Sequence, residues 1–362
     1  MQMASEWYDK PGPLRKGEKP DTAGLNDYLT SNLPGWKGLS DIHQFPSGYS
    51  NLTYLISSGD QDYVLRRPPY GANVKSGHDM SREFRILSAL IAVYPKVPRP
   101  VLFCENPEVV GAPFYLMERV RGVILRSQMS VEMYPPPPLM ANIATSLAES
   151  LAELHRVDYA AAGLSEWGKP EGYVARQVKG WTDRYFKAKT DEVPEIENAA
   201  RWLAENMPAE SAASLIHNDF KYDNVVLNPD NRAEVMAILD WEMATIGDPL
   251  MDLGTSLGYW TDPDDPPEIL ALQLSPTTLP GNPSRSEMAE LYAKKSGRDV
   301  GQILFYYVYG LFKVAVIVQQ IYWRYRMGHT GDTRFANLIH AVRGCGRMAS
   351  QAIAKQRIDR LF

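Results

Sequence analysis

The first third of the chain alternates apolar and polar positions with the period of β-strands. Two β-rich runs between residues 42 and 67 flank Ser58-Gly59-Asp60, and runs joined by a short glycine-containing turn predict a β-hairpin. Residues 99–106 and 112–122 predict two further strands. Residues 78–93 instead carry apolar side chains at helical spacing. A small sheet with one helix is therefore expected here.

Helical periodicity dominates beyond the proline run at residues 135–138. Residues 139–158 predict an amphipathic helix, and two long helices are expected to close the chain. Two short β-rich runs, 224–229 and 233–242, flank a turn and predict a second hairpin. This order predicts an α+β fold in which a small β-rich lobe precedes a larger helical lobe, with a cleft between them.

Composition and charge narrow the domain organisation and the partners. Residues 1–20 mix charge with proline and glycine and lack an apolar run, which predicts a flexible extension without a secretory signal; the small lobe would then occupy 21–118 and the larger lobe 119–362. The net charge of −5, without a Lys/Arg run, argues against a nucleic-acid partner. Two widely separated cysteines, Cys104 and Cys345, favour reduced thiols and hence a cytoplasmic location.

The most apolar segment, residues 303–323, approaches the length of a membrane span. Lys313, Gln319 and Gln320 interrupt it, and tyrosine is frequent. A buried core helix is expected instead, and no membrane partner.

A polar cluster interrupts the apolar pattern in "LIHNDFKYDNVVLNP", residues 215–229. His217, Asp219 and Asn224 follow one another at a fixed spacing, and Asp240 ends the next apolar run. Phosphoryl transfer needs a carboxylate to accept the proton of the attacking hydroxyl, and hard oxygen ligands for the Mg²⁺ that accompanies the nucleotide. Asp219 is suited to the first task, and Asn224 and Asp240 to the second.

Two other interpretations of the cluster compete with phosphoryl transfer. Asp and Asn are common where strands end, so a polar turn explains each residue singly, but not their joint spacing. A metal hydrolase using His217, Asp219 and Asp223 is chemically reasonable. That second interpretation leaves Asp240 and the β-rich lobe without a role.

The segments "HNDFKYDN" and "LDWEMATIGDPLMDLG" resemble the aminoglycoside phosphotransferase family, which has the protein kinase-like fold. More narrowly, "YVLRRPP", "GAPFYLMERVRG" and "ARQVKGW" are similar to the branch of kinase-like domains associated with acyl-CoA dehydrogenases. The resemblance implies that Asp219 is the catalytic base, that Asn224 and Asp240 hold magnesium, and that ATP or GTP is the phosphoryl donor.

Three neighbours of this motif receive supporting roles. Lys221 lies where Ser/Thr protein kinases also carry a lysine, and its charge would neutralise the transferred phosphoryl group; an exposed loop lysine is the alternative. Asp252 looks like the buried aspartate that braces the catalytic loop in kinase-like folds. His217 is expected to hold the loop rather than to titrate in the mechanism.

The small lobe is expected to clamp the nucleotide. The family pattern implies a basic residue at the end of the third strand, paired with an acid from the following helix. Arg66 and Glu83 match it, although protein kinases carry lysine there, and alternation alone leaves Arg66 and Arg67 open. The remaining nucleotide contacts are expected from the loop at 46–52, through Ser47, Gly48 and Ser50, and from the connection at 117–122, which includes Glu118.

The acceptor is the least determined part of the prediction. Residues 163–181 carry Lys169, Arg176 and Lys179, which suit an anion, whereas the acids of residues 262–268 suit a polycation only weakly. The resemblance makes a hydroxyacyl compound or its CoA thioester the working hypothesis. A nucleotide-binding pseudo-enzyme remains a rival; a protein kinase is disfavoured because neither a D-F-G nor an A-P-E element occurs. The oligomeric state stays open.

Overall fold

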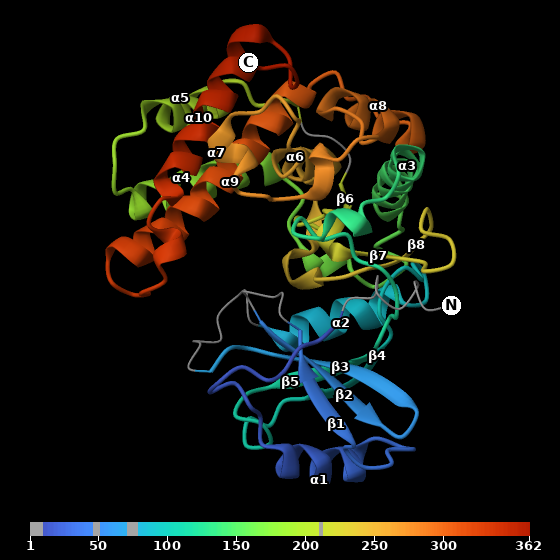
Figure 1. Ribbon diagram of the computed structural model, residues 1–362. Helices are drawn as coiled ribbons and strands as arrows, with labels where there is room; N and C mark the ends of the chain where they lie inside the picture. Colours follow the sequence, from blue (N-terminus) through green and yellow to red (C-terminus); the bar gives the residue numbers. More distant parts are fainter. Residues whose placement is uncertain (1–9, 46–50, 71–78, 210–212) are drawn as a thin grey trace.

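Two lobes make up the molecule, as Figure 1 shows for the computed structural model, which describes residues 10–45, 51–70, 79–209 and 213–362. The N-terminal lobe contains one antiparallel five-stranded sheet in the order β1-β2-β3-β5-β4. Its strands are β1 (Asp41–Gln44), β2 (Leu52–Ser58), β3 (Gln61–Arg67), β4 (Pro100–Cys104) and β5 (Phe114–Glu118). The hairpin predicted around residues 58–60 is β2–β3, paired from Leu52–Arg67 to Ser58–Gln61.

Each face of this sheet is covered by one helix (Figure 1). Helix α1 (Thr22–Asn32) packs Leu25 and Leu29 on the outer face. Helix α2 (Met80–Leu90), the helix predicted within residues 78–93, lies between the sheet and the C-terminal lobe. Asp79 begins α2 by accepting the Arg82 backbone N–H at 3.1 Å. The C-terminal end of β3 faces the other lobe.

The segment 10–20 differs from the flexible extension that its composition predicts. Gly12 forms a β-bridge with Gln44, and the Arg15 backbone N–H donates to the Gln44 side chain at 2.9 Å. Tyr54 donates its hydroxyl to the Glu18 carbonyl. These backbone contacts compensate for the charged composition, so residues 10–20 belong to the N-terminal lobe.

The C-terminal lobe is mainly helical, with two short antiparallel strand pairs that face the N-terminal lobe. The predicted second hairpin is β7 (Val225–Leu227) with β8 (Val235–Ile238), whereas the pairing of β6 (Ser214–Ile216) with β9 (Thr245–Gly247) was not predicted. The helices are α3 (Pro137–Leu154), α4 (Tyr173–Ala188), α5 (Pro194–Glu205), α6 (Pro249–Gly258), α7 (Pro267–Leu270), α8 (Arg285–Ser296), α9 (Ile303–Arg326) and α10 (Leu338–Lys355).

Helix α9 is the apolar segment that is long enough to span a membrane. It lies among α4, α6 and α10, and 78% of its most apolar window is buried within the protein. Two of the polar residues that interrupt it form internal hydrogen bonds: Lys313 Nζ donates to the Asn218 carbonyl, and Gln319 to the Ala188 carbonyl. Its burial matches the predicted core helix.

Helices α6 and α9 cross with their backbones in contact. Gly254 and Gly258, one turn apart on α6, face Gly310 of α9. A Cβ atom at Gly258 would lie 2.6 Å from the Gly310 carbonyl carbon, and one at Gly310 would overlap the Gly254 carbonyl oxygen. Only glycine permits this approach, because a Cβ–backbone distance of that size is sterically forbidden.

The connection between the lobes also needs a glycine. A Cβ atom at Gly122 would lie 2.5 Å from both the Leu227 carbonyl oxygen and Val226 Cγ1. Val123 pairs with Leu227 in an isolated β-bridge immediately afterwards. Close approach to β7 is therefore what the structure requires of Gly122.

Candidate active site

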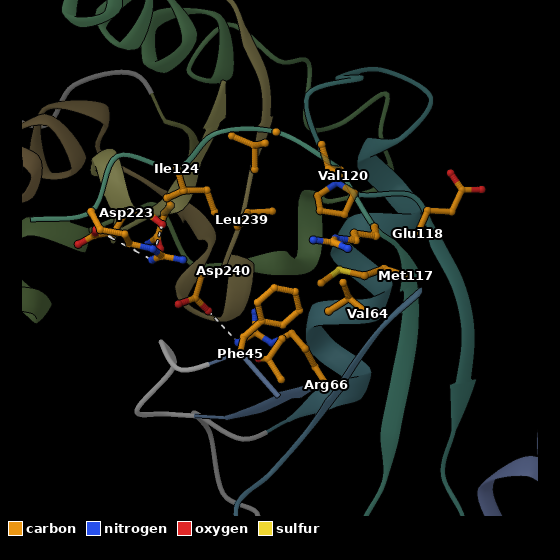
Figure 2. A pocket seen from close by; sticks show the side chains of 17 residues that line it. Phe45, Val64, Arg66, Met117, Glu118, Val120, Ile124, Asp223, Leu239 and Asp240 are labelled. Carbon is orange, nitrogen blue, oxygen red and sulfur yellow. Dashed lines mark hydrogen bonds and ion pairs between the residues drawn. The ribbon is translucent and has the colours of Figure 1, made fainter. Parts of the chain in front are cut away.

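A cavity of about 150 Å³ lies between the lobes and is lined by both (Figure 2). The N-terminal lobe contributes Val64, Arg66 and Met117 from β3 and β5, and the C-terminal lobe contributes Asn224 and Asp240 beside the β7–β8 hairpin. The lining contains both apolar side chains and charged or amide side chains. Such a mixed lining suits a ligand with an apolar ring and a charged group.

Arg66 links the two sides of the cavity. Its Nη1 donates to Glu83 Oε1 at 2.7 Å, which is the predicted pairing, and its Nη2 donates to Asp240 Oδ1 at 2.9 Å (Figure 2). The alternation of β3 turns Arg67 to the opposite face, where it donates to the Val110 carbonyl at 2.6 Å. Arg66 is therefore the member of the pair that faces the cleft.

Asp219 lies on the loop between β6 and β7, beside two other predicted residues. Lys221 Nζ donates to both Asp219 carboxylate oxygens, at 2.8 and 2.7 Å, and Asn224 Nδ2 donates to Oδ2 at 2.8 Å. Burial opposes the charge on Lys221, but Asp219 outweighs it and raises the pKa of the ammonium above its ordinary value. A cation thus stays next to the candidate base across the physiological pH range.

His217 supports the loop from within the core. The ring is fully buried: Nε2 donates to the Leu239 carbonyl at 2.9 Å, and Nδ1 accepts the Asp219 backbone N–H at 3.3 Å. Burial lowers the pKa of His217, which favours the neutral ring that these two contacts require. Because both ring nitrogens are engaged, His217 is unsuited to the metal-ligand role of the hydrolase alternative.

Asp252, near the start of α6, braces the same loop. Its Oδ2 accepts the His217 backbone N–H at 2.6 Å, and its Oδ1 accepts the Asn218 backbone N–H at 2.7 Å. Burial opposes ionisation, but His155 and these N–H groups outweigh it and hold the pKa of Asp252 below its ordinary value. An ionised carboxylate therefore fixes the backbone that leads into Asp219.

Asp240 and Asn224 have the chemistry of a magnesium site. Asp240 adopts a left-handed backbone conformation, φ 67°, directly after β8. Burial opposes its charge, but Arg66 outweighs it and holds the pKa of the carboxyl below its ordinary value. Within the part of the chain that the structure describes, neither Asp240 Oδ2 nor Asn224 Oδ1 accepts a hydrogen bond, so two hard oxygens fit the ion.

Two residues that the sequence analysis did not select also belong to this region. Glu242 Oε2 accepts the Asn51 side-chain amide at 2.7 Å and lies 3.7 Å from Arg66 Nη2, so it joins the first hairpin to the C-terminal lobe. Its position two residues after Asp240 was an available signal. The other is Lys313, whose interruption of an apolar helix was noted only as evidence against a membrane span.

The remaining predicted nucleotide contacts have different outcomes. Ser47, Gly48 and Ser50 lie outside the described residues. Glu118 lines the cavity, but its side chain is exposed and its backbone N–H donates to the Arg99 carbonyl at 2.8 Å. Glu118 therefore forms part of the cavity wall near the connection between the lobes.

The predicted acceptor residues Arg176 and Lys179 form local contacts on and beside α4. Arg176 donates to the backbone carbonyls of Glu171 and Lys169, and Lys179 pairs with Asp183 on the surface of α4. Two of the acids considered for a polycation are also committed elsewhere, because Arg285 pairs with Asp265 and Asp262 at 2.7 and 3.2 Å inside the lobe.

A groove of about 380 Å³ between α4 and α9 carries the exposed basic charge instead. Arg184, Lys187 and Arg324 line it, together with Ile317, Ile321 and Trp323. Among the described residues, no carboxylate forms an ion pair with any of these three basic side chains. Trp181 lies between the groove and Lys313, since its ring centroid is 4.7 Å from Arg184 Cζ and 5.7 Å from Lys313 Nζ.

Comparison with curated proteins identifies relatives that match over most of this chain. The chain is 36% identical over 322 residues to acyl-CoA dehydrogenase family member 11 of Rattus norvegicus, covering 87% of this chain and 41% of that protein. The Gallus gallus protein of the same name is 34% identical, with 96% and 45% covered. The chain thus spans less than half the length of these curated relatives.

Solved structures give the same fold. A candidate aminoglycoside phosphotransferase from Ralstonia eutropha superimposes with a TM-score of 0.77 at 28% identity, covering 93% of this chain and 99% of that one. An aminoglycoside 2″-phosphotransferase bound to GDP and kanamycin shares the fold alone, with a TM-score of 0.60 at 17% identity and coverage of 88% and 96%. The model of the phosphotransferase enzyme family matches residues 41–291. The protein kinase-like arrangement of lobes, the site between them and this match establish that the chain belongs to the phosphotransferase enzyme family.

Proposed function

We propose that the protein is an ATP- or GTP-dependent O-phosphotransferase acting on a hydroxyl group of a small molecule. The observation that carries this proposal is the grouping of Arg66, Asn224 and Asp240 on one interlobe cavity, with Asp219 2.8 Å from the Asn224 amide. Phosphoryl transfer depends mainly on positioning and charge stabilisation, which such a grouping supplies.

Each residue has a separate task in this mechanism. Asp219 orients the acceptor hydroxyl and takes its proton, while the Lys221 ammonium offsets negative charge beside it. Arg66, held by Glu83, contacts the phosphates from the N-terminal lobe. Asn224 and Asp240 would hold magnesium, which when bound neutralises charge on the phosphate oxygens.

The α4–α9 groove supports an anionic acceptor, and we propose a hydroxyacyl compound or its CoA thioester. Arg184, Lys187 and Arg324 offer charge for a carboxylate or phosphate, and Ile317, Ile321 and Trp323 offer apolar contact for an acyl or pantetheine chain. The names of the two curated relatives also point to acyl-CoA chemistry.

The first experiment measures consumption of the γ-phosphate of ATP and GTP with Mg²⁺. Wild type and Asp219→Ala are compared across pools of hydroxyacyl-CoAs, free hydroxy acids, aminoglycosides, amino alcohols and sugars. Turnover with one pool that disappears in Asp219→Ala supports the proposal and identifies the acceptor class. Tight binding of the Mg-nucleotide without turnover in any pool favours the pseudo-enzyme.

The groove has its own test. Arg184→Gln combined with Arg324→Gln should raise the KM for an anionic acceptor about 10- to 100-fold, because two charge-assisted contacts are lost, with the nucleotide KM unchanged. Lys179→Gln is the matched control, since this α4 lysine is exposed and paired with Asp183. Equal acceptor KM values in all variants would exclude the groove as the acceptor site.

A further inference from the structure

Lys313 is a buried lysine beside the loop that carries Asp219. It lies in the middle of α9, its side chain is 3% exposed, and its Nζ donates to the Asn218 carbonyl at 2.9 Å. The Trp181 ring lies 5.7 Å away, and within the described ranges no carboxylate is close enough for an ion pair. Burying an ammonium in this way is costly, so its location calls for a reason beyond packing.

The carbonyl that Lys313 contacts belongs to the peptide unit that enters Asp219. A peptide unit is planar, so the Asn218 carbonyl and the Asp219 N–H move together. Lys313 holds the carbonyl, and His217 Nδ1 accepts the N–H at 3.3 Å. Asn218 itself has φ 67°, a conformation that needs such external contacts to persist.

We propose that Lys313 is a positioning residue for Asp219: it fixes the peptide unit before the carboxylate and places a positive charge behind the catalytic loop. This inference rests on the proposed phosphotransferase function. Lys313 acts through Asn218, since it is not among the residues that line the interlobe cavity or the α4–α9 groove. Its loss should therefore impair the chemical step more than nucleotide binding.

The surroundings of Lys313 also predict how its charge responds to pH. Burial is the largest influence and lowers its pKa to about 8, although Asp219 and Asp252 favour the charged form. Lys221 and Arg184, which also face it, oppose the charge. The ammonium is thus present at neutral pH and is lost as the pH rises through about 8, so kcat should fall over that range.

The test compares Lys313→Met with Gln319→Met. Gln319 is the matched control because it is also buried on α9, at 1% exposure, and donates to the Ala188 carbonyl, away from the loop. We expect Lys313→Met to lower kcat about 10- to 100-fold, to keep the nucleotide KM within about twofold, and to lose the fall in kcat above pH 8. Equal kcat losses in both variants, or a wild-type pH profile in Lys313→Met, would overturn the proposal.

A second measurement is independent of turnover. Hydrogen exchange of the peptide covering residues 215–221 should be faster in Lys313→Met than in wild type, and unchanged in Gln319→Met. If wild type phosphorylates no acceptor, the proposed function fails while faster exchange still supports the positioning role. Unchanged exchange in Lys313→Met overturns that role whether or not the enzyme is active.

Discussion

The C-terminal lobe buries two cations, Arg285 and Lys313, in opposite ways. Both Nη atoms of Arg285 donate to Asp265 at 2.7 Å, Asp262 lies 3.2 Å away, and Nε donates to the Ile358 carbonyl. Lys313 has one carbonyl acceptor and an aromatic ring. Carboxylates thus neutralise the charge of Arg285, which stabilises the fold. Among the described residues no carboxylate pairs with Lys313, and its charge lies beside the loop that carries Asp219.

The largest effect is expected where charge is used in the reaction. Asp219→Asn keeps the shape of the side chain but cannot accept the hydroxyl proton, so kcat should fall about 10²- to 10⁴-fold. The Kd for the Mg-nucleotide, measured by calorimetry, should stay within about threefold. Turnover close to that of wild type would remove Asp219 from the role of base.

The Arg285 cluster should respond through stability instead. Asp265→Ala leaves a buried guanidinium with Asp262 alone, which should lower the free energy of unfolding by about 3–5 kcal/mol. Urea unfolding measures the loss, and kcat of the folded enzyme should be unaffected. The exposed neighbour Asp264→Ala serves as control. A large loss of kcat in folded Asp265→Ala would contradict the division between the two regions.

Lys313 should make unfolding depend on pH. Its folded pKa of about 8 lies below the unfolded value of 10.5, so the unfolded chain binds more protons between these values and stability rises with pH. Relative to Lys313→Met, wild type should gain about 3 kcal/mol from pH 8 to pH 10.5. A parallel pair of curves would show that Lys313 titrates normally.

Asp240 tests the metal part of the site. Asp240→Ala removes the proposed magnesium ligand and one partner of Arg66, so binding of the Mg-nucleotide should weaken about 10- to 100-fold. Binding of the nucleotide in EDTA should change much less. Equal weakening with and without Mg²⁺ would assign Asp240 to the Arg66 network alone.

The smallest effect is expected at an exposed ion pair. Lys179 and Asp183 are 2.7 Å apart, with side chains 77% and 52% exposed. Lys179→Ala should leave the urea midpoint unchanged, because solvent screens such pairs. A clear shift of that midpoint would mean that α4 depends on its surface charge.

Local patterns predicted the elements whose signals lie within one segment. The β2–β3 and β7–β8 hairpins and helix α2 follow from alternation, turn residues and helical spacing over short windows. The β6–β9 pair escaped prediction because its strands are three residues each and lie far apart in the chain. Pairing of that kind depends on the tertiary fold.

In the site, too, residues with a local sequence signal were predicted, and a residue that acts over a long sequence separation was not. Asp219, Asn224 and Asp240 were selected by spacing and resemblance. Asn224 and Asp240 line one cavity, and Asp219 accepts a hydrogen bond from the Asn224 amide. The resemblance alone selected Arg66 rather than Arg67; the structure has Arg66 in the cavity wall and Arg67 on the face that α1 covers. Lys313 was missed because its target, the Asn218 carbonyl, is a backbone group almost a hundred positions earlier.

The glycine contact between α6 and α9 helps to fix the position of the loop that carries Asp219. Asp252 on α6 accepts the Asn218 backbone N–H, and Lys313 on α9 donates to the Asn218 carbonyl. The distance between the two helices therefore determines the distance between these two hydrogen-bonding groups. Because Gly254 and Gly310 are in backbone contact, no side chain lies between the helices that could change its rotamer to accommodate a shift. The position of the Asp219 carboxylate thus depends on the absence of side chains at Gly254 and Gly310. A Cβ atom at either glycine would force α6 and α9 apart, and so shift the two residues that hold the loop, without contacting Asp219 itself.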